Sequence, residues 1–304
     1  MKNYMPEGKI YEENNLGKYT VNELRDAMDS GKILEGRVSL CDREHNLHLD
    51  LGGAKGIIER THGAIGIDNG SVKDIALISR VNKPVAFKVI EINTDEYGNF
   101  VAKLSRKAAQ IECQKNYISK LIPGDIVNAR VTHMEKFGAF VDIGCGINAL
   151  IPIDMISISR IPHPCERFDE NEDIRAVVRS TENGKITLSH RELLGNWEEN
   201  ANLFSDGETV PGIIRSIEDY GIFVELTPNL AGLAESVENV KISQNASVYI
   251  KSIIPERMKL KLVIVDSFED NYKDKSNNYF INDEHIDYWR YSPNECDKLI
   301  ETKF

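Results

Sequence analysis

The sequence predicts a mainly β fold in which small closed barrels are repeated in tandem and joined by short α-helices. The first observation is an internal repeat, because the stretch 137–144 recurs at 220–226. The second is an alternation of apolar and polar residues around both copies, which is typical of half-buried strands. The third is a glycine in the second strand of each copy, where the strand of a small barrel coils sharply. Five short strands in one such unit favour a closed barrel over a flat sheet.

Residues 1–33 are predicted to be a leader with one short helix near 21–30. Thr20 and Glu23 have the spacing of a capping box, in which the threonine hydroxyl and the glutamate each satisfy a free backbone amide. Gly31 suits the left-handed conformation that ends many helices.

Residues 34–105 are predicted to be a divergent first repeat. Leucines at 47, 49 and 51 alternate with polar residues, which indicates a strand with one buried face. An insertion separates Ile58 from Pro84 and enlarges this copy. When this repeat is aligned with the next one at the glycine after the second strand, His45 and His48 fall on Phe137 and Phe140.

Residues 106–123 are predicted to be a linker helix that Pro123 stops. The second repeat follows at 124–189. The side of this helix expected to be apolar carries Ala108, Ile111, Ile118 and Leu121.

Residues 190–206 are predicted to be a second linker helix, opened by a capping box at Ser189 and Glu192. We expect Trp197 of this helix to pack onto an adjacent barrel.

The third repeat is predicted at 207–265 and an acidic, weakly ordered tail at 266–304. A polar, charged stretch at 270–278 indicates a flexible linker into that tail. Trp289 and Tyr291 leave open that part of the tail docks.

The formal net charge is −11, which at first opposes a nucleic-acid partner. The acidic excess is concentrated in the tail and the second linker, so basic faces on the repeats remain open. No apolar stretch approaches the length of about 20 residues that a membrane span needs. No signal-peptide pattern follows Met1, so we expect a cytoplasmic protein without a membrane partner. The five cysteines are scattered without metal-ligand spacing, and neither a metal nor a cofactor is expected.

The second repeat carries four motifs in order: GDIV at 124–127, FGAFVDIG at 137–144, NALIP at 148–152 and GKITLS at 184–189. These closely resemble the RNA-binding domain of bacterial ribosomal protein S-one, which is a five-stranded OB-fold barrel. The third repeat resembles it through GETV at 207–210 and YGIFVEL at 220–226, and the first repeat more weakly. The linker at 188–200 is similar to the connection in short homologues from Gram-positive bacteria.

The resemblance implies binding of single-stranded RNA, above all mRNA, in translation and with the small ribosomal subunit. The family pattern often has a histidine after the third strand. Pro152, Glu235 and Glu59 lie near that place here, so one expected contact is missing from each repeat. Binding by several repeats together is therefore expected.

Strand alternation predicts which residues face RNA. If Ala139, Val141 and Ile143 are buried, Phe140 and Asp142 must face outward. The same register exposes Phe223 and Glu225 in the third repeat. The residues predicted to contact RNA are the rings of Phe137, Phe140, Tyr220 and Phe223, the imidazoles of His45 and His48, and the cations of Arg130, Lys185, Lys259 and Lys261. The alternative for each ring is a packed strand end or a contact with a neighbouring barrel, and for each lysine a solvated charge.

The sequence favours a non-enzymatic RNA-binding protein, because it contains no phosphate-cradling glycine loop and no nucleophile motif. Two alternatives stay open. One is a protein-interaction module, and the other is an accessory RNA-binding factor in transcription or RNA turnover.

Overall fold

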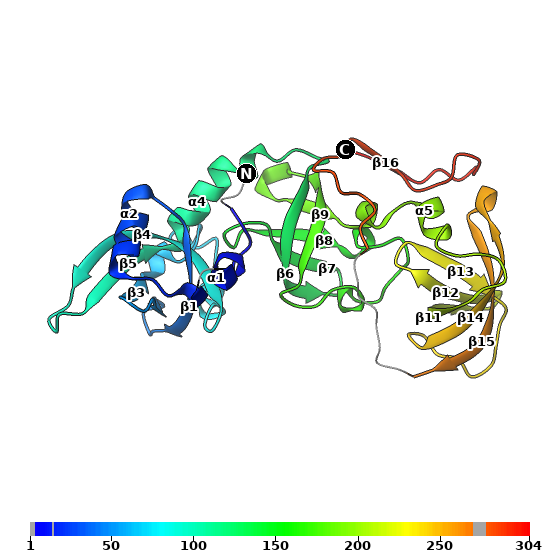
Figure 1. Ribbon diagram of the computed structural model, residues 1–304, viewed down its shortest axis with the longest axis horizontal. Coiled ribbons are helices and arrows are strands. Elements are labelled where there is room, and N and C mark those ends of the chain that lie inside the picture. Colours follow the sequence, from blue (N-terminus) through cyan, green and yellow to red (C-terminus); the bar gives the residue numbers. More distant parts are fainter. Residues whose placement is uncertain (1–3, 14, 270–277) are drawn as a thin grey trace. The chain divides into compact units, whose positions relative to one another are not determined.

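The computed structural model describes residues 4–13, 15–269 and 278–304. Its strands form three closed barrels of five strands each, which confirms the predicted fold class (Figure 1). In every barrel the order around the wall is first, second, third, fifth and fourth strand. The third and fifth strands pair in parallel. This arrangement is the small OB-fold barrel.

Barrel 1 encloses a core of alternating residues, among them Val38, Leu49 and Phe87, which are almost fully buried. The insertion between its third and fourth strands contains α3 (Ile75–Ile78), and Leu77 of this helix joins the same core. The strands of barrel 1 are β1 (Leu34–Cys41), β2 (Leu47–Asp50), β3 (Lys55–Ile58), β4 (Pro84–Thr94) and β5 (Phe100–Ser105).

Two helices precede barrel 1, α1 (Lys9–Glu13) and α2 (Val21–Ser30). The capping box of α2 forms as the sequence predicts, with Glu23 accepting from the Thr20 amide at 2.7 Å. Gly31 ends the helix with φ of 66°. The buried side of α2 packs into the core of barrel 1.

Barrel 2 buries Ala139, Val141 and Ile143 completely, as the alternation predicts. Its strands are β6 (Ile126–Glu135), β7 (Gly138–Asp142), β8 (Asn148–Pro152), β9 (Asp173–Ser180) and β10 (Thr187–Ser189).

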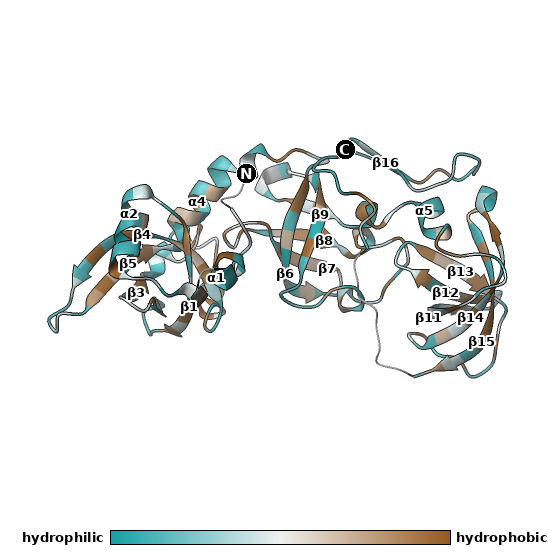
Figure 2. Ribbon diagram, viewed as in Figure 1, coloured by the Kyte–Doolittle hydropathy of each residue, from teal (hydrophilic) through white to brown (hydrophobic). Residues whose placement is uncertain are grey.

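Barrel 3 buries Ile222 and Val224 in the same register. Its strands are β11 (Thr209–Glu218), β12 (Gly221–Thr227), β13 (Leu230–Ala234), β14 (Asn245–Ile254) and β15 (Lys259–Phe268). Figure 2 shows hydrophobic residues alternating with hydrophilic ones along the barrel strands.

The first linker contains α4 (Arg106–Asn116) and a 3-10 turn at Ile118–Lys120. The predicted apolar side is wrong at Ile111, which is exposed. The buried face of α4 instead carries Arg106, because this guanidinium pairs with the buried carboxylate of Glu7.

The second linker was predicted as one helix, and this is wrong. A 3-10 turn at Arg191–Leu194 is separated from α5 (Trp197–Ala201) by Gly195, whose φ is 81°. A side chain at Gly195 would meet the Phe280 ring and would be strained at this φ, so the break requires glycine. Trp197 is buried in the core cluster of barrel 3.

The prediction of a weakly ordered tail is wrong for residues 278–304. These residues form the hairpin of β16 (Tyr288–Arg290) and β17 (Glu301–Lys303). Trp289 and Tyr291 are buried against the barrel 3 core, and the Tyr291 hydroxyl donates to the Asn229 carbonyl at 2.6 Å. The aromatic residues thus outweigh the polar composition of the tail. Of the predicted flexible linker at 270–278, residues 270–277 lie outside the described part.

The chain divides into two compact units. The first contains the residues up to Leu121 together with 128–130 and 142–148, and the second contains the remainder. No helix in the described ranges is both long enough and apolar enough to span a membrane.

Candidate nucleic-acid interface

Barrels 2 and 3 each carry a pair of aromatic rings at the start of the second strand, with the same geometry. The ring centroids of Phe137 and Phe140 are 5.9 Å apart, and the rings meet at 87°. The Tyr220 and Phe223 centroids are 6.2 Å apart, and the angle is again 87°. Phe137 is 57% exposed and Tyr220 is 70% exposed, while Phe140 and Phe223 are half-buried. Each barrel therefore presents an edge-to-face pair to solvent.

A glycine after the first ring makes this geometry possible. A Cβ on Gly138 would lie 2.4 Å from the carbonyl oxygen of Ile151, and a Cβ on Gly221 would lie 2.5 Å from that of Ala234. Only glycine lets the second strand approach the third so closely. The two rings therefore stand on a tightly coiled strand start in both barrels.

In barrel 3 the half-buried ring belongs to a line of side chains that crosses the sheet. Phe223 pairs with Ser216 on β11 and with Leu233 on β13. Leu233 in turn pairs with Lys261 on β15. We call Phe223, Leu233 and Lys261 the cross-strand row, because neighbouring strands place them side by side on the outer face. The row puts an ammonium group two strands from the ring.

A row of the same kind lies on barrel 1, where it is His48, Ile57 and Lys103. In barrel 2 Thr187 of β10 pairs with Leu150 of β8, as Lys261 pairs with Leu233, and Phe140 lies on β7, the strand next to β8. Lys103 was missed as a site residue, although its place before Leu104 in the last strand matches that of Lys261 before Leu262.

The other predicted lysines lie near the ends of the row. Lys259 is exposed at the start of β15, and Lys185 is exposed two residues before β10 begins. Both stay candidates for contacts with phosphate groups.

The two histidines of barrel 1 that were predicted to contact RNA, His45 and His48, are each near a carboxylate. His48 Nε2 lies 2.9 Å from Oδ2 of Asp42, and this hydrogen bond holds the pKa of Asp42 at about 2. His45 lies in the turn before β2, with φ of 63°, and its Nδ1 is 4.0 Å from Oδ2 of Asp74. Barrel 1 thus carries imidazole beside acid in place of the aromatic pair.

Arg130 does not face outward as predicted. Only 7% of it is exposed, and its guanidinium makes two contacts with the Glu12 carboxylate, at 3.1 and 3.2 Å. Three consecutive residues of β6, Ala129 to Val131, are buried, so the simple alternation fails at this point. The bidentate ion pair makes Arg130 a structural cation.

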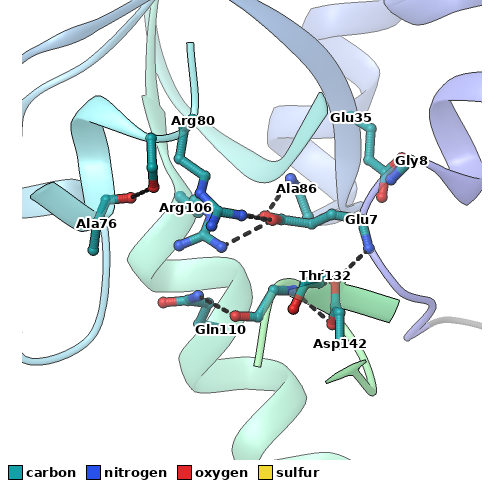
Figure 3. A network of polar contacts seen from close by, with 12 residues as sticks. Glu7, Gly8, Glu35, Ala76, Arg80, Ala86, Arg106, Gln110, Thr132 and Asp142 are labelled. Atoms are coloured by element: carbon teal, nitrogen blue, oxygen red, sulfur yellow. Dashed lines mark hydrogen bonds and ion pairs between the residues drawn. The ribbon is translucent and has the colours of Figure 1, made fainter. Parts of the chain in front are cut away.

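Asp142 was predicted to face outward and is buried instead (Figure 3). Its carboxylate accepts hydrogen bonds from the backbone amides of Glu7 at 2.6 Å and Gly144 at 2.8 Å. Burial and the neighbouring Glu7 raise the pKa of Asp142 to about 7. Glu7 itself accepts from Arg106 at 2.6 and 2.9 Å. The end of the aromatic strand β7 is therefore held by the N-terminal segment.

Glu225, the equivalent acid in barrel 3, is also buried rather than exposed. Its carboxylate accepts from Arg167 at 2.6 Å and from Arg215 at 2.7 Å. Burial alone would raise the pKa of Glu225, but the two guanidiniums outweigh it and keep the pKa below its usual value. Glu225 thus stabilises barrel 3 through buried ion pairs with Arg167 and Arg215.

His133 on β6 was missed by the sequence reasoning. Its ring lies nearly parallel to that of Phe140, with centroids 6.4 Å apart and planes at 16°. Alternation from the buried Val131 would place His133 inside, yet it is exposed. The first strands of barrels 1 and 3 shift register at the comparable place, which is the mark of a bulge. Beyond a bulge, residues that strict alternation places inside face outward, and the reverse. The pattern of apolar residues in the sequence does not reveal the bulge.

The aromatic pairs lie at the second strands and the lysines at the fifth strands, with the third strand between them, and OB-folds bind oligonucleotides on the face of the second and third strands. In comparisons with known proteins, residues 120–191 match the S1 RNA binding domain family. The second barrel thus matches this domain family. The predicted resemblance to the ribosomal S-one family is confirmed.

Several curated proteins are similar over more of the chain. The small ribosomal subunit protein bS1 of Leuconostoc lactis is 28% identical over 214 residues, which cover 64% of this chain and 49% of that protein. The bS1 homolog of Bacillus cereus is 28% identical over 206 residues, covering 62% of this chain and 53% of the homolog. The bS1 protein of Staphylococcus aureus is 24% identical over 253 residues, covering 77% and 62%. The chain spans about half the length of the first two of these S1 relatives.

Proposed function

We propose that this protein binds single-stranded RNA without catalysis, through the aromatic pairs and cross-strand rows of its S1 barrels. The observation that carries the proposal is the same edge-to-face ring pair at the same strand position in two barrels. Base stacking on such rings contributes about 1–3 kcal/mol per base and tolerates any base. Weak sequence preference follows.

The distribution of cations supports a role for lysine in this binding. In the described part of the chain, four arginine side chains are buried in ion pairs with glutamates: Arg106, Arg130, Arg167 and Arg215. The lysines at or near the fifth strands of barrels 2 and 3, by contrast, are exposed: Lys185, Lys259 and Lys261. A phosphate group of a stacked nucleotide can therefore reach them.

Binding by several barrels together is the expected mode. Each row holds few contacts, and barrel 1 has imidazole and acid where the others have aromatic pairs. Tethering weak sites on one chain raises the effective concentration of the second site once the first is occupied.

The names of the relatives place those proteins in the small ribosomal subunit. We propose that this protein likewise acts in translation, holding unstructured mRNA near the small subunit in the cytoplasm. Sequencing of RNA crosslinked to the protein in cells tests this finer proposal. Enrichment of mRNA leaders supports it, and enrichment of one structured small RNA contradicts it in favour of a role in RNA turnover.

The binding proposal itself is tested with a fluorescent, unstructured RNA of about 20 nucleotides. The double variant Phe140→Ala with Phe223→Ala removes one ring from each pair, and we expect its affinity to fall at least tenfold. Tyr288→Ala is the matched control, because this half-exposed ring lies on the β16–β17 hairpin, outside the rows. Unchanged affinity of the double variant would refute the stacking face.

A further inference from the structure

His133 adds a third ring to the aromatic pair of barrel 2. Its side chain is 57% exposed, and its Nε2 lies 2.8 Å from Oε1 of Glu135, itself half-exposed, so this contact orients the imidazole at the surface. The Phe137 ring meets Phe140 edge-on, whereas the His133 ring lies nearly parallel to Phe140. The parallel pair is thus a different kind of contact from the edge-to-face pair.

The spacing of the parallel pair fits a nucleobase. Stacked bases in a nucleic-acid strand lie about 3.4 Å apart, so two rings that hold one base between them are about 6.8 Å apart. The centroids of His133 and Phe140 are 6.4 Å apart, and their planes differ by only 16°. A small rotation of the exposed imidazole opens the remaining gap.

We propose that His133 and Phe140 hold one unpaired base between their rings, so that barrel 2 contacts this base on both faces. The inference rests on the proposed function, since it concerns the RNA that the same face binds. It adds a specific ligand, which is a single unpaired base, and it names His133 as a second residue that stacks on this base.

Barrel 3 cannot form this clamp. His133 lies seven positions before Phe140, and Ser216 lies seven positions before Phe223. Ser216 pairs directly with Phe223 across β11 and β12, and its hydroxymethyl group offers no ring. In barrel 1 the residue paired with His48 is Leu40. We therefore expect barrel 2 to bind a base more tightly than either neighbour.

The test measures RNA binding by barrel 2. It uses the Phe223→Ala background, in which barrel 3 lacks its half-buried ring, and a short unstructured RNA that carries one 2-aminopurine. We expect His133→Ser to weaken binding about tenfold and to reduce the quenching of 2-aminopurine, because the base loses one stacked ring. His133→Phe restores a ring without an imidazole and should recover most of the affinity and quenching. His133→Gln removes the ring but keeps a polar side chain, so it should behave as His133→Ser does.

The reciprocal change tests RNA binding by barrel 3. In a Phe140→Ala background, Ser216→His should raise the affinity by a similar factor. Thermal unfolding of each variant separates loss of a ring from loss of the fold.

The outcomes separate the two proposals. If His133→Ser and His133→Gln bind as tightly as the parent while Phe140→Ala weakens binding, the clamp is wrong and the RNA-binding function stands. If Phe140→Ala also has no effect, the proposed function itself is wrong.

Discussion

The backbone amide of Glu7 donates a hydrogen bond of 2.6 Å to the carboxylate of Asp142, which lies 135 residues further along the chain. The same carboxylate accepts from the amides of Gly144 and Gly146. Asp142 follows Phe140 by two residues on β7. Strict alternation places Asp142 at the surface. Its buried carboxylate instead anchors β7, the strand that carries the Phe140 ring.

Asp142→Ala should destabilise the first unit by about 2–5 kcal/mol, because it leaves several buried backbone amides without an acceptor. Asp142→Asn keeps one acceptor oxygen and should lose less. Chemical denaturation followed by far-ultraviolet circular dichroism measures both. Equal stability of the alanine variant and the parent would show that the amides find other partners.

Glu35 gives the first unit a pH dependence. Burial raises its pKa to about 8, and its Oε2 accepts from the amides of Gly8 and Tyr11. The folded state holds the proton more tightly than the unfolded state, so stability is greatest below the unfolded pKa near 4.5. It should fall as the pH rises from there through about 8.

Melting temperatures between pH 5 and pH 9 test this slope. Glu35→Gln imitates the neutral carboxyl group and should reduce the slope, with the raised pKa of Asp142 contributing the remainder, whereas Glu91→Gln, at an exposed glutamate, should leave it unchanged. A parent protein whose melting temperature does not fall over this range contradicts the expectation.

The residue on the fifth strand at the end of the cross-strand row, Lys261 in barrel 3 and Thr187 in barrel 2, should change how strongly RNA binding depends on salt concentration. Lys261→Ala removes a cation close to the bound strand, and we expect the slope of log affinity against log salt to fall by about one. Thr187→Lys gives barrel 2 the cation that barrel 3 already has, and it should steepen the slope by a similar amount. Lys303→Ala, on the β16–β17 hairpin, is the control. Identical slopes for all variants would place the phosphate groups elsewhere.

The docked tail should stabilise the second unit. Trp289 is 5% exposed in the barrel 3 cluster, so Trp289→Ala is expected to destabilise this unit by about 3–5 kcal/mol. Tyr291→Phe deletes only the hydroxyl that donates to Asn229 and should lose about 1 kcal/mol. Hydrogen exchange of β13 reports the loss directly. Unaltered exchange in the tryptophan variant would mean that the tail adds nothing to barrel 3.

The barrels could be predicted because their information is local. Alternation buries Val141 and Val224, and glycine after the first ring marks the coiled strand start, all within a few residues. The same local evidence placed the two aromatic pairs correctly at the surface.

The errors at the site came from partners distant in sequence and from one shift of register. Asp142 and Glu225 are buried because an amide or a guanidinium far along the chain satisfies them. Arg130 turned inward and His133 outward because the first strand departs from strict alternation. Neither effect leaves a trace in the spacing of apolar residues. Composition failed in the tail for a related reason, since two buried rings outweigh many polar neighbours.

The long separation between Glu7 and its partners also bears on how the chain folds as it is made. Arg106 leaves the ribosome 99 residues after Glu7, and Asp142 leaves it 135 residues after Glu7. At typical synthesis rates the interval before Asp142 appears is about 10 s. Until then the segment that holds β7 has no finished binding site. The first unit is therefore completed only once the nascent chain has extended into the second barrel.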